Sequence, residues 1–131
     1  MMWLTTLEQV IVLHDKLIAR TGGTHGVRDA RLVESAVQRA SSGYGEYELY
    51  ATLPEKAAAV CCGLVGNHGF LDGNKRVGVA CMLLILRQNQ YAIRYTQAEL
   101  IGLGLAMARG EIDVPEVAKW IESHSATGES K

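Results

Sequence analysis

The sequence lacks the features that mark several classes of protein. It carries no basic excess, since its net charge at pH 7 is -1. Proteins that bind nucleic acids usually are basic, so we expect no direct nucleic-acid partner. The longest apolar run, residues 77–86, is about half the length that crosses a bilayer, so we expect no membrane association. The N-terminus shows no basic stretch followed by an apolar one, which predicts no targeting segment and a cytoplasmic location.

Cysteine is also scarce. The three cysteines are Cys61, Cys62 and Cys81, an odd number without a C-x-x-C pair. All three stand among apolar residues, so we expect reduced core side chains rather than disulfides. No Cys/His spacing in the sequence supports a zinc site.

What the sequence does have is helical periodicity. Apolar residues recur at spacings of three and four in six segments, most of which begin with a capping residue. The predicted helices begin near Thr6, Asp29, Pro54, Asn74, Thr96 and Asp113. This pattern predicts one all-α domain, residues 1–131, packed as a compact bundle around a buried central helix at about residues 74–90.

Other segments carry weaker predictions. Residues 41–53 lack helical period and should form a loop. Gly66 and Gly69 should end the third helix, and Ile101 should face the core from the fifth. The polar residues 123–131 should form a disordered tail. Three histidines look unremarkable: His14 and His124 on polar helix faces, and His25 in a glycine-rich turn.

The most informative stretch is residues 68–76, which lead directly into the predicted central helix. A helix N-terminus offers unpaired N–H groups and a partial positive charge, which suit a bound anion. Gly73 permits a sharp turn and close approach of a ligand. Asn74, Lys75 and Arg76 follow in the first turn, where cations disfavour the helix itself. Their presence is better explained by a bound polyanion such as a nucleotide phosphate chain.

The same stretch contains a base and a metal ligand. A neutral imidazole at His68 is suited to accept a hydroxyl proton near neutral pH. Asp72 suits Mg²⁺, which at nucleotides is commonly held by one or two carboxylates together with phosphates and water. Phe70 should plug the loop into the core. Taken singly these residues would make an ordinary turn, cap or surface pair, but together they favour phosphoryl or nucleotidyl transfer.

The run from Asn67 to Arg76, Asn-His-x-Phe-x-Asp-Gly-Asn-Lys-Arg, resembles the core motif of the Fic/Doc family and most closely its Doc branch. Residues 26–36 are similar to the Doc-type second-helix region. The resemblance extends over roughly residues 4–122 and implies the all-α Fic fold. It also implies site roles. The histidine His68 would activate a target hydroxyl, Asp72 would hold magnesium, and the phosphates of ATP would be bound by Gly73, Asn74, Lys75 and Arg76.

Two positions depart from the pattern of Fic AMP-transferases. Lys75 stands where those enzymes typically have glycine, and Val79 stands where they have a second arginine that orients the nucleotide. Doc toxins share both features and are understood to bind ATP reversed, with its γ-phosphate toward the nucleophile. The resemblance therefore implies a toxin kinase of the bacterial cytoplasm. Its target would be a threonine of elongation factor Tu, and the effect would be arrest of translation.

The resemblance also implies partners. No self-inhibitory helix motif is present, so inhibition would come from a separate, Phd-like antitoxin with a segment docked in a groove near the site. Residues 41–53 occupy the place of the family's target-docking flap, where Tyr44, Tyr47 and Tyr50 would anchor an extended target segment. A tyrosine-bearing surface loop explains these three residues equally well.

Two alternatives remain open at this stage. The loop could transfer AMP or another nucleotide to a protein hydroxyl. The chain could also be an inactive Doc-like module that binds or regulates a partner. An independent zinc or iron enzyme is disfavoured, because His68 and Asp72 are too few ligands for such a site.

Overall fold

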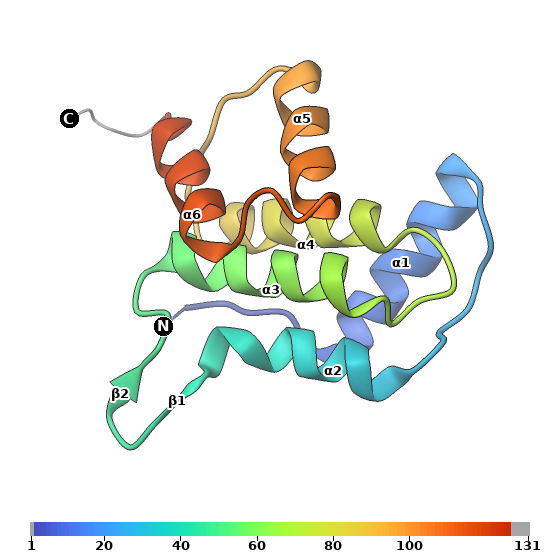
Figure 1. Ribbon diagram of the computed structural model, residues 1–131, viewed down its shortest axis with the longest axis horizontal. Coiled ribbons are helices and arrows are strands. Elements are labelled where there is room, and N and C mark those ends of the chain that lie inside the picture. Colours follow the sequence, from blue (N-terminus) through green and yellow to red (C-terminus); the bar gives the residue numbers. More distant parts are fainter. Residues whose placement is uncertain (1, 127–131) are drawn as a thin grey trace.

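The computed structural model describes residues 2–126. Within this range the chain forms six α-helices, a 3₁₀ turn at Arg39–Ser41 and a short hairpin (Figure 1). The helices are α1 (Leu7–Thr21), α2 (Ala30–Gln38), α3 (Leu53–Asn67), α4 (Asn74–Gln88), α5 (Gln97–Ala108) and α6 (Val114–Ser123), and the hairpin strands are β1 (Gly43–Tyr44) and β2 (Tyr47–Glu48). The all-α prediction is confirmed. None of the described helices is long and apolar enough to cross a membrane.

Capping residues explain where the helices begin. Thr6 accepts a hydrogen bond from the backbone of Gln9, whose side chain in turn accepts one from the backbone of Thr6. Thr96 caps α5 in the same reciprocal way. Such reciprocal pairs, called capping boxes, satisfy backbone N–H groups that have no partner inside the helix. The third helix begins one residue earlier than predicted, because Thr52 is its cap and Pro54 lies in its first turn.

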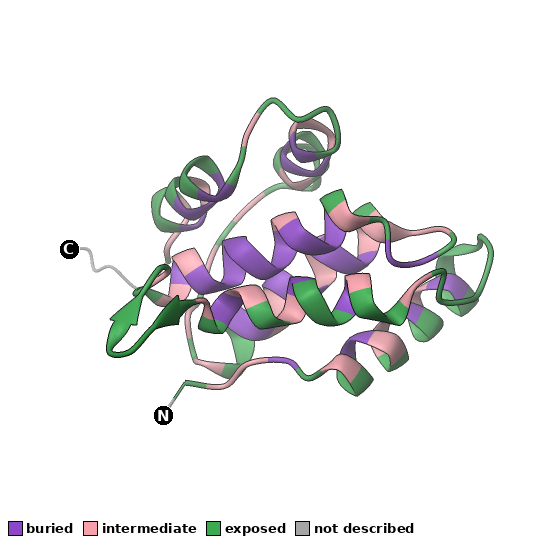
Figure 2. Cartoon of the chain, turned by 60° about the horizontal axis from the view of Figure 1, so that its bottom comes forward, coloured by how far each residue is buried: buried purple, intermediate pink, exposed green. Residues whose placement is uncertain are grey.

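The centre of the fold differs in one respect from the prediction. The predicted central helix exists as α4, but Val79, Leu83 and Leu84 on its flank are only half-buried. The most enclosed helix is α3, in which every residue from 56 to 61 is buried (Figure 2). The sequence predicted α4 as the central helix because its apolar side chains are large. The side chains of α3 are mostly small, and they let neighbouring helices approach it closely on several sides.

Glycines mark two of these close approaches. A Cβ atom added at Gly63 would lie 2.9 Å from the Cβ of Ala36 in α2. One added at Gly78 of α4 would lie 2.8 Å from a methyl group of Val65 in α3. Both distances are shorter than van der Waals contact. The close approach of α2 to α3 therefore requires glycine at position 63 of α3, and that of α4 to α3 requires glycine at position 78 of α4.

Three sequence predictions about local structure need correction. Gly66 lies inside α3, which ends at His68 instead. Residues 41–53 are not merely a loop but contain the β1–β2 hairpin. Ile101 is 59% exposed rather than directed into the core. Its neighbours on α5 supply the buried face: Leu103, Gly104 and Met107.

The predicted disordered tail is also partly wrong. Ser123 is the last residue of α6, and Ser125 forms an antiparallel bridge with Ile93. The backbone N–H of Ala126 donates to the carbonyl of Ala92 at 2.8 Å. Residues 123–126 therefore pack against the segment before α5. The rest of the predicted tail, residues 127–131, lies outside the described residues.

Candidate functional site

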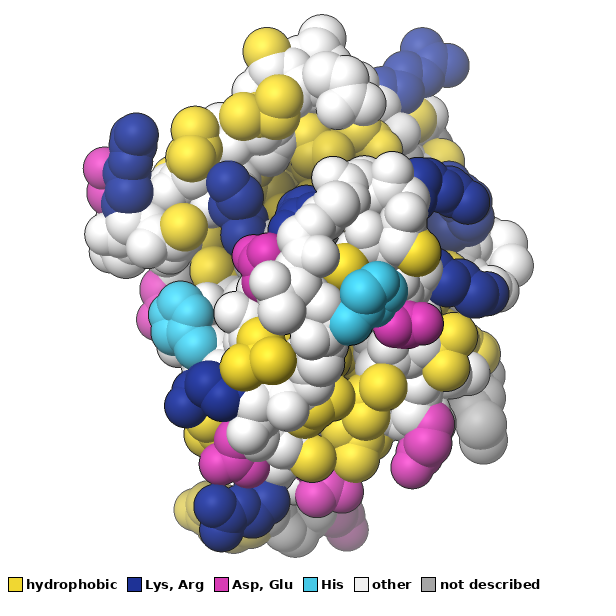
Figure 3. All heavy atoms as spheres, turned by 90° about the vertical axis from the view of Figure 1, so that its right-hand side faces the viewer, with side chains coloured by type: hydrophobic (Ala, Val, Ile, Leu, Met, Phe, Trp, Pro, Cys, Tyr) yellow, Lys and Arg dark blue, Asp and Glu magenta, His cyan; other side chains and the backbone are white. Residues whose placement is uncertain are grey.

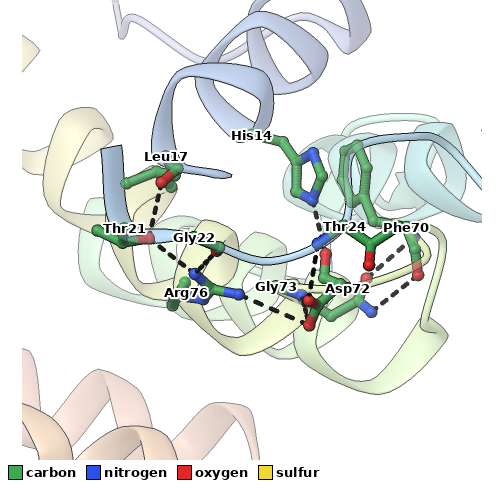
Figure 4. A network of polar contacts seen from close by, with 10 residues as sticks. His14, Leu17, Thr21, Gly22, Thr24, Phe70, Asp72, Gly73 and Arg76 are labelled. Carbon is green, nitrogen blue, oxygen red and sulfur yellow. Dashed lines mark hydrogen bonds and ion pairs between the residues drawn. The ribbon is translucent and has the colours of Figure 1, made fainter. Parts of the chain in front are cut away.

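The loop between α3 and α4 lies along the connection between α1 and α2. The carbonyl of Gly69 accepts hydrogen bonds from the backbone N–H groups of Arg28 and Asp29, at 2.8 and 2.9 Å. Phe70 forms an antiparallel bridge with Val27, and Figure 4 shows the α1–α2 connection passing beside Asp72. Residues 69–71 are thus held by backbone contacts from a segment forty residues or more earlier in the chain.

His68 stands at the entrance of this loop. It ends α3 in the left-handed conformation, with φ 53° and ψ 47°, and it is exposed. Its backbone carbonyl accepts a 2.7 Å hydrogen bond from Nε of Arg28. Within residues 2–126 its imidazole makes no hydrogen bond or ion pair, so both ring nitrogens remain open to a substrate.

Asp72 is the best-held carboxylate of the site. Its Oδ2 accepts the backbone N–H of Thr24 at 3.0 Å, and its Oδ1 accepts the backbone N–H of Gly73 at 2.8 Å. Nη2 of Arg76 lies 3.6 Å from Oδ1. These contacts, that from Thr24 first, lower the pKa of the Asp72 carboxyl group. The side chain is therefore ionised at neutral pH, and it is still 45% exposed.

The start of α4 fits the predicted anion site. Gly73 is the cap residue in the left-handed region, with φ 76°, and no side chain caps the helix. The first N–H groups of α4 are consequently open to a ligand. Lys75 is exposed, and its ammonium has no partner in the described part of the chain. Its aliphatic stem passes over Gly104 of α5, where an added Cβ would lie 3.3 Å from it.

Arg76 has a structural task as well. Its Nη1 donates to Oγ1 of Thr21 at 2.7 Å and to the carbonyl of Gly22 at 2.6 Å. A cation at the C-terminal end of α1 is favourable, because that end carries partial negative charge. Arg76 therefore ties α1 to α4 and faces Asp72 (Figure 4). From the sequence, a bound polyanion was the explanation for both Lys75 and Arg76. These contacts give Arg76 a structural explanation and leave only Lys75 to be explained by an anion.

Asn74 is likewise paired inside the loop. Its Oδ1 accepts the backbone N–H of Phe70 and its Nδ2 donates to the carbonyl of Phe70, each at 3.0 Å. The amide thus closes the loop into a ring of hydrogen bonds. Phe70 is only 2% exposed, which confirms that it plugs the loop into the core. A phosphate contact by Asn74 remains a prediction.

His14 was misread from the sequence. It is 2% exposed rather than on a polar face, and its ring stacks on Phe70 with centroids 3.8 Å apart. Its Nε2 lies 2.6 Å from the backbone carbonyl of Asp72, and since a carbonyl only accepts, this nitrogen carries the proton. The sequence did offer a signal, because His14 falls four residues from both Val10 and Ile18, the other buried residues of α1.

The remaining two histidines lie outside the loop. Nδ1 of His25 pairs with Asp15 at 2.6 Å on the surface, in agreement with a turn residue. His124 is half-buried rather than on a polar face: it stacks on Trp120 with centroids 4.0 Å apart and lies 3.3 Å from Glu99. It thereby links α6 to α5.

The hairpin tyrosines are not brought to the loop. Tyr44 and Tyr47 are 83% and 61% exposed and lie near each other across the hairpin. Tyr50 is half-buried, and its hydroxyl accepts a hydrogen bond from Arg39. In Figures 1 and 2 the hairpin lies at the opposite end of α3 from the α3–α4 loop. A helix of 15 residues is about 22 Å long, so only an extended partner could contact both.

An apolar groove borders the site on its other side. It has a volume of about 280 Å³ and lies between α1, α4 and α5. Its lining residues are Leu17, Thr21, Lys75, Arg76, Val79, Ala80, Leu83, Leu100, Ile101 and Gly104. Figure 3 shows the neighbouring face of the molecule, where basic side chains stand beside exposed hydrophobic ones.

Comparison with known proteins gives a consistent result. The family model described as "Fic/DOC family" matches residues 3–86, a range that contains the whole of the 68–76 loop. The protein named "Protein kinase doc" from Escherichia phage P1 is 35% identical over 111 residues, which cover 85% of this chain and 86% of that protein. The protein named "Toxin Doc" from Mycolicibacterium smegmatis is 30% identical over 111 residues, 83% of this chain and 85% of that protein.

Proposed function

Because this chain belongs to the Fic/Doc family, we propose that it is a Doc-like toxin that transfers the γ-phosphate of ATP to a hydroxyl group of a target protein. The observation that carries the proposal is that some side chains of the loop are free while another is fixed. The side chains of His68 and Lys75 are uncommitted, while Asp72 between them is held ionised by backbone N–H groups. A free base, a free cation and a fixed carboxylate are the parts that phosphoryl transfer requires.

The proposed step balances as follows. His68 accepts the proton of the target hydroxyl, and that oxygen forms a bond to the γ-phosphorus. The bond between the γ-phosphorus and the bridging oxygen breaks, and ADP leaves with the electron pair. Lys75 and the open N–H groups of α4 would stabilise the negative charge on the phosphates, since they require no rearrangement to do so.

The donor set also suits magnesium. No group of three His, Cys, Asp or Glu side chains that could hold a metal by itself occurs within residues 2–126. Asp72 has carboxylate lone pairs left beyond its two backbone hydrogen bonds, so it would hold the ion together with nucleotide phosphates and water. When bound, Mg²⁺ would neutralise charge on the phosphates.

The preference for the γ-phosphate rests on two side chains. Lys75 occupies the start of α4 with an exposed cation, and Val79 lies one turn later, half-buried in the apolar groove. A valine cannot hold the distal phosphates of ATP in that direction. We therefore expect ATP to bind with its γ-phosphate toward His68.

The same proposal includes the target and the inhibitor. We infer that the target hydroxyl belongs to a threonine of elongation factor Tu and that its phosphorylation arrests translation in the bacterial cytoplasm. We infer further that a Phd-like antitoxin inserts a segment into the groove between α1, α4 and α5. An occupant of this groove would cover Lys75 and Arg76, which line it, and so compete with the nucleotide.

The test uses purified elongation factor Tu, ATP, magnesium and the protein, followed by intact mass spectrometry of the target. The proposal expects addition of one phosphate with wild-type protein and only a small residual rate of addition with His68→Ala. The double variant Lys75→Gly with Val79→Arg should shift the product toward added AMP. Added AMP with the wild type would support nucleotidyl transfer instead. No modification of this or any lysate protein, with toxicity unaffected by His68→Ala, would support a binding module.

A further inference from the structure

Arg28 contacts the backbone on which the candidate base is carried. Its Nε donates to the carbonyl of His68 at 2.7 Å, and its Nη2 donates to the carbonyl of Asn67 at 3.4 Å. These are among the last carbonyls of α3, which have no partner within the helix. The backbone N–H of Arg28 also donates to the carbonyl of Gly69. One residue of the α1–α2 connection therefore contacts three successive carbonyls around His68.

The conformation that these contacts hold is unusual. His68 and Gln90 are the two residues other than glycine with positive φ in the described chain. A left-handed backbone at such a residue persists only where the surroundings over-determine it. The direction of the His68 imidazole depends on this backbone, because the ring itself makes no hydrogen bond, ion pair or aromatic stacking contact within residues 2–126. Without the guanidinium, the peptide after His68 could rotate and carry the ring with it.

We infer that Arg28 is a positioning residue: it fixes the His68 backbone in the left-handed conformation and thereby aims the imidazole at the substrate. The inference rests on the proposed function, in which His68 is the base. The structure places Nε and Nη2 of Arg28 on carbonyls at the end of α3, so the inferred action is on this backbone rather than on phosphate.

The chain offers a matched control three residues away. Arg31 lies in the first turn of α2, and its side chain is 90% exposed and pairs with Asp29. We expect Arg28→Met to lower kcat for γ-phosphate transfer by about 10- to 100-fold, because small misplacements of a reacting group have effects of this size. KM for ATP should stay within about twofold, and Arg31→Met should change neither constant. Arg28→Lys, which can still reach one carbonyl, should recover part of the lost kcat.

A double-mutant cycle separates positioning from direct action. In the His68→Ala background, Arg28→Met should cause no further loss of kcat, since there is no base left to position. A loss equal to that in the wild-type background would overturn the inference, as would a rise in KM for ATP without a change in kcat. The second outcome would identify Arg28 as a phosphate ligand.

A readout without activity keeps the inference testable if the proposed function fails. The side-chain NMR signals of the four histidines can be assigned with single substitutions and compared between wild type, Arg28→Met and Arg31→Met. Only the His68 signal should move and broaden, and only in Arg28→Met, while His14, His25 and His124 serve as internal controls. An unchanged His68 signal, in a variant whose thermal unfolding is unchanged, would refute the inference even if no phosphate transfer is found in any variant.

Discussion

Two adjacent glycines allow the geometry of the site to be tested by a single methyl group. Gly22 and Gly23 both have positive φ, 91° and 119°, so alanine at either position strains the backbone. Their surroundings differ. A Cβ at Gly22 would have nothing within 4 Å, whereas one at Gly23 would lie 2.6 Å from Oδ2 of Asp72 and 2.9 Å from Nη2 of Arg76.

The expected magnitudes follow from this difference. Backbone strain of this kind costs about 1–3 kcal/mol, which for a chain of this size lowers Tm by about 4 °C per kcal/mol. Both variants should be destabilised to this extent. In Gly23→Ala the carboxylate must also move by about 1 Å to reach ordinary contact distance. Because a misplacement of that size can cost about 100-fold in rate, Gly23→Ala should lose most of its activity and Gly22→Ala should keep it.

The assay combines thermal unfolding with γ-phosphate transfer measured well below both Tm values, so that each variant is folded. Gly22→Ala controls for strain and for lost stability. Equal activity of the two variants would show that the position of the Asp72 carboxylate does not govern the reaction, and it would refute the reasoning.

Three further outcomes can be measured on the folded protein. His14→Ala removes a buried ring and leaves the Asp72 carbonyl without its partner. Urea denaturation should therefore show a free energy of unfolding lower by about 2–4 kcal/mol. The exposed control His25→Ala should lower it by less than about 0.5 kcal/mol, and equal losses in the two variants would contradict the burial of His14. The lowered pKa of Asp72, caused first by the Thr24 N–H, stabilises the folded state above the unfolded pKa and ceases to do so as pH falls through the folded one. The stability difference between wild type and Asp72→Asn should therefore shrink below about pH 4, and a constant difference would count against it. Burial raises the pKa of Cys62 to about 12, so iodoacetamide should label the native protein far more slowly than the unfolded one, and rapid native labelling would show that the thiol is accessible.

The fold was predictable where local signals and burial agree. Thr6 and Thr96 show their capping chemistry in the sequence itself, and the structure bears both out. The helix predicted as central exists as α4, but the sequence did not reveal that α3 is more enclosed, because hydropathy weights large side chains such as those of α4. The enclosure of α3 depends on small residues such as Gly63, whose value is visible only beside Ala36.

The candidate site could be identified from the sequence as a set of residues but not as an arrangement. The 68–76 loop is contiguous, so its histidine, carboxylate and cations could be recognised together. The residues that hold it come from α1 and the α1–α2 connection: His14, Gly23, Thr24 and Arg28. Their contacts are close approaches and hydrogen bonds between side chains and backbone groups, over forty residues or more, which leave no pattern in composition or spacing. Only His14, in step with Val10 and Ile18, could have been recognised as buried.

The central claim is that this loop transfers the γ-phosphate through His68. The most direct measurement incubates the protein and magnesium with a bacterial lysate and ATP labelled at either the γ- or the α-phosphate, beside a His68→Ala control. The account predicts label from γ-labelled ATP only, on one protein of the size of elongation factor Tu, and its loss in the control. Label from α-labelled ATP, or γ label that persists in His68→Ala, would contradict it.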